Sequence, residues 1–209
     1  MTDYVNIKEE EVFTRMKGLE PFRLFSHHDA DGVYGAVLLS KVFEIGTIEF
    51  PDIFGEYGED ANVSIDFGQP LTDMEWSGIA IDHHPHDMRE RKYALIRDNM
   101  PAGGIVYDAF KTKIPPEYSW LVAGAYVGDG QAAMIPPDIY EQHPSLLEGR
   151  ASIYQSYGKT SVYEYSLYSL LSSPINAVCR IGRAYQAYQI LKTCKTPDDV
   201  ISNQVYNEA

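Results

Sequence analysis

The sequence predicts an α/β fold, in which a mostly parallel sheet is flanked by helices and followed by a helical C-terminal segment. The first observation is that short apolar runs alternate with longer stretches of helical composition over residues 1–135. Strands that alternate with helices are joined by right-handed crossovers, which give a parallel sheet with helices on both faces. The second observation is that several apolar runs end in Asp or His. In parallel sheets the functional site lies at the carboxyl ends of the strands, so these polar residues are expected to converge.

The expected elements follow one another in a regular order. Four helices are predicted from apolar spacing or helical composition, over residues 8–18, 32–43, 101–110 and 119–127. Four strands are predicted from short apolar runs bounded by Gly, Asp or Pro, over residues 22–26, 46–50, 62–66 and 77–82. In the remainder, Pro174 is expected to start a long helix that runs to about Lys195. We therefore divide the chain into an α/β core over residues 1–135 and a helical extension over residues 136–209.

The helical extension is rich in tyrosine. Five of these residues fall in one stretch, at Tyr154, Tyr157, Tyr163, Tyr165 and Tyr168. A row of tyrosines can stack on bases, but a tyrosine that buries its ring and leaves its hydroxyl in water is commoner. Core packing is therefore the preferred interpretation.

The charge balance argues against one class of protein. The formal net charge is −13, with 17 Lys and Arg against 30 Asp and Glu, so no basic stripe is available to grip a long nucleic acid. Bound divalent cations would supply positive charge at the place where a phosphate docks. A short or small phosphate ester therefore fits this composition better than a long polyanion.

The sequence gives no indication of a membrane segment or an export signal. The hydrophobic content is 44%, and no apolar run approaches the ~18 residues that span a bilayer. The start of the chain lacks a basic segment followed by an apolar one. The two cysteines, Cys179 and Cys194, are too few for a disulfide framework. We expect a cytoplasmic protein with reduced thiols.

Two polar motifs follow predicted strands and contain the residues that can do chemistry. The sequence SHHDADG at residues 26–32 has two carboxylates at i and i+2, and DHH at residues 82–84 has an Asp and two His. Carboxylate oxygens and imidazole nitrogens suit Mn²⁺, Mg²⁺ or Fe²⁺. Two such cations about 3.5–4 Å apart activate water for phosphoester cleavage. Alone, Asp29 and Asp31 would be turn or helix-capping carboxylates, and the DHH triplet is what favours a metal site.

Four motifs together resemble those of the DHH phosphoesterase superfamily. In chain order they are His28 to Gly32, Asp66-Phe67-Gly68, Asp82 to Pro85 and Gly128-Asp129-Gly130. The superfamily includes RecJ-type exonucleases, oligoribonucleases, cyclic-dinucleotide phosphodiesterases and family II inorganic pyrophosphatases. The motifs cover residues 22–130, and the stretch from Asn176 to Arg183 is similar to the connecting helix of bacterial and archaeal members. One such motif is weak evidence, whereas four in this order are strong.

The resemblance implies two divalent metal ions, with Mn²⁺ the first choice and Mg²⁺ the second. It implies that one ion is held by Asp29 and Asp66. The other ion would be held by Asp31, Asp66, His83 and Asp129. Asp66 would bridge the two ions, which suits a carboxylate because it offers two oxygens.

The resemblance also gives roles to the residues around these ligands. His84 is expected to contact the scissile phosphate as a catalytic residue, and Asp82 to orient a histidine at the catalytic centre. Several relatives have a histidine four residues before the first motif Asp, where this sequence has Phe25. His28, His27 or water would then complete the ligand set. The RecJ-like branch also lacks that histidine.

Other residues are candidates for phosphate contacts. Asn99, Gly103 and Gly104 could offer an amide and backbone N–H groups at a helix N-terminus. An ordinary glycine-containing turn is the alternative. Arg180 and Arg183, one turn apart on the late helix, could clamp a phosphate or pair with surface acids.

The sequence therefore favours a metal-dependent phosphodiesterase in which two cations activate a water. A RecJ-like single-strand exonuclease or a short-oligonucleotide hydrolase comes first. A cyclic-dinucleotide phosphodiesterase and an inorganic pyrophosphatase are alternatives, the latter less favoured because of Phe25. The rival class is a non-catalytic module that binds a nucleotide or a replication partner. Many relatives carry a second, glycine-rich substrate-binding domain, and no such motif follows residue 130.

Overall fold

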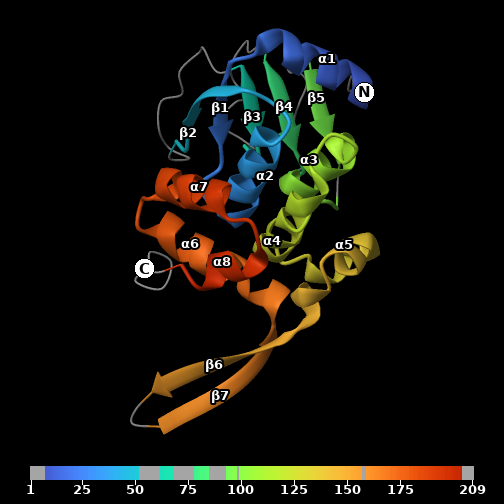
Figure 1. The fold of residues 1–209 in the computed structure, drawn as a ribbon. Helices are drawn as coiled ribbons and strands as arrows, with labels where there is room; N and C mark the ends of the chain where they lie inside the picture. Colours follow the sequence, from blue (N-terminus) through green and yellow to red (C-terminus); the bar gives the residue numbers. More distant parts are fainter. Residues whose placement is uncertain are drawn as a thin grey trace.

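The structure of the chain is a computed structural model (Figure 1). It describes residues 8–51, 62–67, 78–84, 93–97, 99–156 and 159–203, without the side chains of 93 and 150–164. Two residues of the sequence motifs, Gly68 and Pro85, lie outside the described residues. Within the described part of the chain, no helix combines the length and apolar content needed to cross a bilayer.

The core of the molecule is a five-stranded sheet in which all pairings are parallel. Its strands are β1 (Phe22–Ser26), β2 (Ile45–Glu49), β3 (Val63–Ile65), β4 (Ile79–Asp82) and β5 (Tyr93–Ile96). The strand order is β2-β1-β3-β4-β5. The predicted α/β class is confirmed, and the four predicted strands correspond to β1 to β4. Strand β5 was not among the predicted elements.

The strand order creates a switch point at the centre of the sheet. The chain runs from β1 to the edge strand β2, and then returns to β3 on the other side of β1 before continuing to β4 and β5. Ligand sites of open parallel sheets lie where the order reverses, outside the carboxyl ends of the strands. The ends of β1, β3 and β4 meet at this place.

Helices pack on one face of the sheet and on each other. The helices are α2 (Ala30–Ser40), α3 (Ala102–Phe110) and α4 (Leu121–Gly128), all near their predicted ranges. α2 and α3 contact the strands and each other, and α4 packs on α2. The Tyr34 ring lies against Gly124, where an added Cβ would come within 2.2 Å of it. The links from β3 to β4 and from β4 to β5 are largely outside the described residues, so helices on the other face stay a prediction.

The end of the sheet opposite the switch point is covered by α1 (Glu9–Leu19). Its Val12 and Met16 are fully buried. The Phe13 ring lies 5.5 Å from that of Phe43 and 6.3 Å from that of Phe110, measured between centroids. This aromatic cluster joins α1 to the ends of α2 and α3.

The prediction that residues 136–209 are helical is wrong for one segment. An antiparallel hairpin, β6 (Gly149–Ser156) and β7 (Lys159–Ser166), projects away from the sheet and helices (Figure 1). Its two strands contain Ile, Val, Thr and three Tyr, which are residue types that favour strands. The remainder contains the helices α5 (Pro137–Gln142), α6 (Ser172–Arg180), α7 (Ala184–Thr193) and α8 (Pro197–Ile201).

The predicted long helix from Pro174 to Lys195 is also wrong, because it is two helices. α6 ends at Arg180 and α7 begins at Ala184. Gly182 has φ +74° and donates its N–H to the Cys179 carbonyl at 2.9 Å, which is how a helix is closed by a left-handed glycine. The two helices pack across α2 and share its core. The division of the chain at residue 135 therefore stays a prediction.

The tyrosine cluster lies partly outside the described residues. Tyr157 lies outside the described residues, and the side chains of Tyr154 and Tyr163 are not described. Tyr168 is half-buried and packs against Tyr140 with ring centroids 5.7 Å apart, while Tyr165 is exposed. Packing accounts for Tyr168, and the role of the others stays a prediction.

Candidate metal centre

The loop after β1 is shaped by its glycine and by the start of α2. Asp29 caps this helix, and its Oδ1 accepts the Gly32 N–H at 3.0 Å. An added Cβ on Gly32 would come within 2.3 Å of the His27 carbonyl oxygen, so the loop needs glycine here. The cap explains the local conformation of Asp29, and its Oδ2 remains available to the site.

Asp31 is held in place by a second helix. Its side chain is 2% exposed, and it accepts the N–H groups of Ala102 at 2.7 Å and Gly103 at 2.8 Å. These N–H groups open α3, where the helix dipole favours an anion. The Gly103 N–H considered for phosphate is therefore engaged by Asp31, and Gly104 is buried in the same turn.

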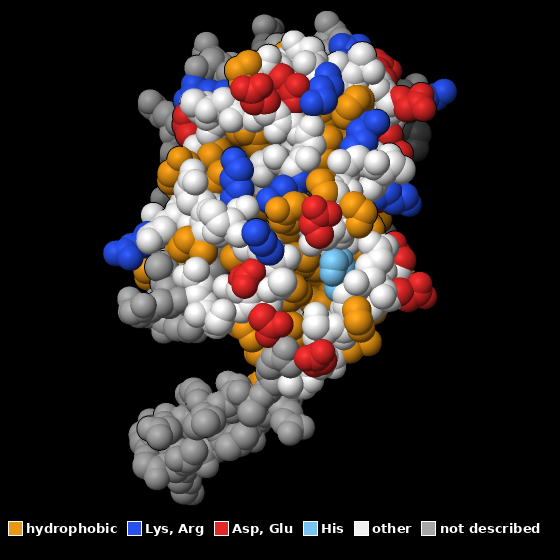
Figure 2. All heavy atoms as spheres, in the orientation of Figure 1, with side chains coloured by type: hydrophobic (Ala, Val, Ile, Leu, Met, Phe, Trp, Pro, Cys, Tyr) orange, Lys and Arg blue, Asp and Glu red, His pale blue; other side chains and the backbone are white. Residues whose placement is uncertain are grey.

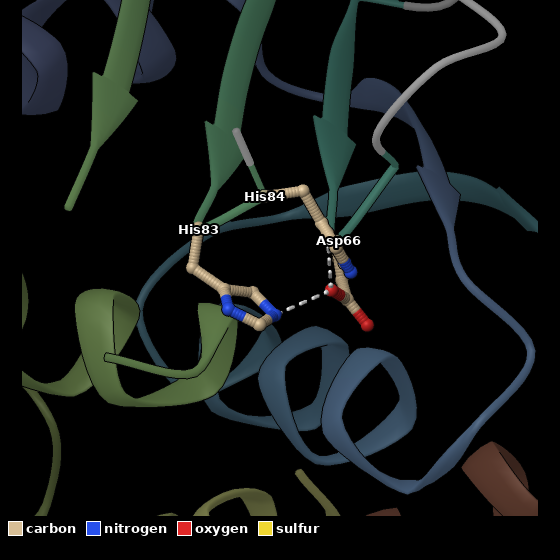
Figure 3. Close-up of side chains that lie close together, drawn as sticks. All are labelled: Asp66, His83 and His84. Atoms are coloured by element: carbon tan, nitrogen blue, oxygen red, sulfur yellow. Dashed lines mark ion pairs between the residues drawn. The ribbon is translucent and has the colours of Figure 1, made fainter. Parts of the chain in front are cut away.

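Asp66 lies at the centre of the site, directly after β3. It has φ 55°, a left-handed conformation that Asp tolerates better than most residues. Its Oδ1 is 3.3 Å from His83 Nε2 and 3.6 Å from His84 Nδ1. Figure 3 shows both imidazoles reaching from the end of β4 toward this carboxylate.

One group of ligand atoms surrounds His83. Its Nε2 lies 3.3 Å from Asp66 Oδ1, 3.7 Å from Asp31 Oδ2 and 3.8 Å from Asp129 Oδ1. Asp129 follows the last turn of α4, and its Oδ2 accepts a hydrogen bond from Gln131 Nε2 at 2.5 Å. These four residues are those that the family resemblance assigns to one ion.

A second group of ligand atoms surrounds His27. Its Nδ1 lies 2.8 Å from Asp29 Oδ2 and 3.5 Å from Asp66 Oδ2. Of the two histidines left open by the sequence, His27 joins this group, whereas His28 lines a neighbouring cavity. The two groups share Asp66, which turns one oxygen toward each.

The electrostatics of both groups fit a cation. Burial raises the pKa of Asp31 well above its ordinary value, and the charges of Asp66 and Asp29 raise it further. Burial opposes protonation of His27, but the neighbouring carboxylates of Asp29 and Asp66 outweigh it and raise the pKa to about 10. In this structure a proton on His27 therefore provides positive charge that a metal ion could replace.

The hydrogen bonding also fits a metal ion. Asp66 Oδ1 and His27 Nδ1 are buried, and neither makes a well-directed hydrogen bond within the described residues, despite their short contacts. Buried polar atoms without partners are costly, and a bound cation would satisfy both of them. Oxygen and imidazole donors of this kind suit Mn²⁺ or Mg²⁺.

Asp82 is buried and holds the backbone of the two histidines that follow it. It is 1% exposed, and its Oδ1 accepts the backbone N–H of His83 at 2.7 Å and of His84 at 3.1 Å. The same oxygen is 3.0 Å from His84 Nδ1, and this hydrogen bond raises the pKa of His84. The side chain of His84 is 44% exposed, so it faces the solvent side of the cluster.

The remaining candidates lie apart from these groups. Asn99 has φ 71° and is exposed, which fits the turn alternative. Arg180 is exposed and lines the same cavity as His28, whereas Arg183 follows the helix break. Neither arginine makes an ion pair with the residues that the structure describes.

Two residues near the site had no assigned role in the sequence. Gln131 fixes Asp129, and Asn176 Oδ1 accepts the Ala30 N–H at 2.8 Å beside the Asp29 cap. Asn176 is 146 positions away from Ala30, so no local pattern indicates this contact. The similarity of its segment to the family's connecting helix was the only available signal.

Comparisons with known proteins agree with this arrangement at the level of the fold. No protein-family model and no curated protein sequence matches the chain. A crystal structure of the exonuclease RecJ bound to manganese matches with TM-score 0.61 and 15% identity, over 97% of this chain and 64% of that one. RecJ with Mn²⁺ from Thermus thermophilus matches with TM-score 0.55 and 16% identity, over 96% and 36%.

A phosphodiesterase structure matches as well. The pGpG-specific enzyme PggH from Vibrio cholerae has TM-score 0.56 and 18% identity, over 90% of this chain and 57% of that one. The chain thus has the fold of the DHH phosphoesterase superfamily, as its motifs indicate. It spans between 36% and 64% of the length of these structures.

Proposed function

We propose that the chain is a metal-dependent phosphoesterase that hydrolyses a phosphodiester of a short single-stranded nucleic acid or a nucleotide. The observation that carries the proposal is the position of Asp66, with one carboxylate oxygen near His83 and the other near His27. Each side then has its own carboxylates and imidazole, which is the requirement for two neighbouring cations. The fold shared with manganese-bound RecJ supports the same class.

We assign the donors to two ions. One ion would be held by His27, Asp29 and Asp66. The other would be held by Asp31, Asp66, His83 and Asp129. When bound, such cations lower the pKa of water and neutralise charge that develops on phosphate oxygens. Mn²⁺ is our first choice and Mg²⁺ the second, because both suit oxygen and imidazole ligands.

The protein's own side chains would position the substrate and offset the negative charge of its phosphate. Asp82 fixes the ring of His84 through Nδ1, and the raised pKa of His84 favours its cationic form. A cationic imidazole beside Asp66 can donate a hydrogen bond to a phosphate or leaving oxygen. The first turn of α3 fixes Asp31, so its carboxylate does not need to reorganise when substrate binds.

The charge distribution favours a short substrate. On the face drawn in Figure 2, Lys and Arg side chains are interspersed with Asp and Glu, and the described residues form no continuous basic surface there. A long polyanion would lack the phosphate contacts that give nucleic-acid binding its strength. We therefore place a short oligonucleotide or nucleotide before a long strand, and a cytoplasmic location remains our expectation.

The test is a substrate panel measured with Mn²⁺, with Mg²⁺ and with excess EDTA. The panel contains single-stranded DNA, di- to pentanucleotides, cyclic di-AMP, pyrophosphate and bis-p-nitrophenyl phosphate. We expect Mn²⁺-dependent cleavage with the short oligonucleotides preferred. Equal rates with Mn²⁺ and EDTA would refute the proposal, and preferential pyrophosphate cleavage would change the substrate. A protein that binds nucleotide but neither holds metal nor cleaves any substrate would instead be a non-catalytic module.

A further inference from the structure

A cavity of about 970 Å³ opens beside the metal centre. It is lined by the loop after β1, the end of β2, the end of α4, and the helices α6 and α7. Small-molecule sites usually measure about 300–1,000 Å³, so this cavity can hold a nucleotide-sized group. Of the residues assigned to the two ions, Asp29 alone lines it.

The cavity and the metal centre share a wall. Asp29 lines the cavity, and it also belongs to the group of metal-ligand candidates around His27. A molecule whose phosphate lies at the metal centre can therefore extend its next group into the cavity. The chemistry of the lining then decides what that group is.

One side of the cavity is aromatic and held in place. Tyr185 and Phe50 both line it, and Tyr185 is 54% exposed. Tyr188 lies behind them, with its ring centroid 6.4 Å from that of Tyr185 and 6.2 Å from that of Phe50. The Tyr185 hydroxyl accepts a hydrogen bond from Gln189 Nε2 at 2.7 Å, which restrains the ring. An exposed, restrained ring is a surface for stacking.

The other side of the cavity offers hydrogen-bond donors. Asn176 and Arg180 stand one turn apart on α6, so they share a face of this helix. Asn176 Oδ1 is used by the Ala30 N–H, which fixes the amide and leaves Nδ2 as a donor. Arg180 is exposed, and its guanidinium has no ion pair within the described residues.

We propose that this cavity binds the nucleoside next to the scissile phosphate, with its base stacked on Tyr185 and its flanking phosphate paired with Arg180. The proposal rests on the proposed function, and it names the residues that would recognise the nucleoside of that substrate. Stacking on an aromatic ring tolerates any base, so the subsite selects for a base without selecting its sequence. A pyrophosphate or a simple alkyl phosphate would leave the aromatic wall unused.

The first experiment measures stacking directly. A 2-aminopurine nucleotide is titrated with the full chain, with Mn²⁺ and with EDTA, and its fluorescence quenching is followed. Because a base loses its stacking partner, Tyr185→Ala should weaken binding about tenfold, while Tyr185→Phe keeps the ring and the affinity. Ile181→Ala is the matched control, because Ile181 is 52% exposed in the same segment but does not line the cavity.

The second experiment separates this subsite from the proposed activity. A dinucleotide is compared with its abasic analogue as substrate, and wild type should prefer the base-bearing form about tenfold, a preference that Tyr185→Ala removes. If both forms are cleaved equally and Tyr185→Ala changes neither binding nor rate, the subsite is refuted while the phosphoesterase stands. If nothing is cleaved but quenching still depends on Tyr185, the activity is refuted and the subsite stands.

Discussion

The two ends of the parallel sheet are built from opposite kinds of side chain. At the end covered by α1, the Phe43 ring lies 5.5 Å from Phe13 and 5.2 Å from Phe110 between centroids. At the carboxyl end, the side chains of Asp31 and Asp66 are each 2% exposed and carry raised pKa values. The aromatic end is stable by itself, since apolar burial needs no partner outside the protein. On the proposed function, a bound cation would complete the carboxylate end.

Because of this difference, we expect the aromatic end of the sheet to determine stability and the carboxylate end to determine the proposed activity. Aromatic packing stabilises the fold in every state, whereas buried carboxylates that repel one another cost free energy in the metal-free protein. Substitutions at one end should therefore change the free energy of unfolding and spare the chemistry. Substitutions at the other end should do the reverse.

The largest effect is expected for Asp66→Ala. A single transition-state contact is worth about 10²–10³-fold in rate, and losing the shared carboxylate removes a donor from both groups, so activity should fall by more than that. The metal-free variant should be at least as stable as wild type, because a buried, repelling carboxylate is gone. Hydrolysis rate, metal content and melting temperature with EDTA check this.

The control for Asp66→Ala is Glu117→Ala, which removes an exposed carboxylate outside both groups. It should retain metal and activity. An Asp66→Ala protein that keeps its two metals and its rate would contradict the assignment of Asp66 as the shared ligand.

The opposite end is probed by Phe43→Ala. Phe43 is 4% exposed and contacts three other phenylalanine rings, so truncation should cost about 3–5 kcal/mol of unfolding free energy. Denaturant unfolding measures this loss. At temperatures where the variant is folded, its rate with Mn²⁺ should stay within about threefold of wild type. A large loss of rate in the folded variant would show that the two ends are coupled.

The sequence predicts the features that depend on local residue patterns better than those that depend on contacts between distant residues. Strands β1, β3 and β4 were predicted because strands buried on both faces are short and apolar. Strand β2 lies at the sheet edge with no fully buried residue, and it was predicted from a short run bounded by Gly and Pro. Asp29, Asp31, Asp66 and His83 come together because each follows a strand or opens a helix at the switch point, as their spacing predicted. Topology alone brings them to one edge of the sheet.

Other features depend on contacts that the sequence does not display. The choice between His27 and His28 was left open, because neighbouring side chains point in different directions and a one-residue difference decides which joins the site. The helix break was missed because Gly182 can continue a helix at a modest cost. The hairpin was missed because its strand-favouring Ile, Val, Thr and Tyr are interspersed with polar residues, which leaves no long apolar run. The role of Asn176 depends on its contact with Ala30, 146 positions away.

The next prediction distinguishes the roles of His83 and His84 at the carboxyl end of the sheet. His83→Ala removes a donor and should lower metal affinity and activity together, with partial rescue at high Mn²⁺. His84→Ala should keep the metals and lower kcat by about 10²–10³-fold, because it removes a transition-state contact. Metal stoichiometry and kcat on both variants separate the roles. Loss of metal in His84→Ala with retention in His83→Ala would reverse the assignment.

The smallest effect compares two glycines that differ in backbone conformation. An added Cβ meets nothing within 4 Å at Gly18 in α1 or at Gly182 between α6 and α7. Gly182 has φ +74°, so Gly182→Ala should lower the unfolding free energy by about 1–2 kcal/mol. Gly18→Ala sits in a helix and should raise it by up to about 1 kcal/mol.

The same two glycines also test whether the break between α6 and α7 is needed for nucleotide binding in the cavity beside the metal centre. Gly182 lines that cavity, whereas Gly18 belongs to the helix at the aromatic end. Strain at the break should shift α7 and with it Tyr185, so Gly182→Ala should weaken 2-aminopurine nucleotide binding while Gly18→Ala leaves it unchanged. Denaturant unfolding and nucleotide titration on both variants measure the two effects. A left-handed conformation costs free energy for any L-residue with a side chain, even where space is open. If Gly182→Ala is as stable as wild type, residue 182 does not have the left-handed conformation.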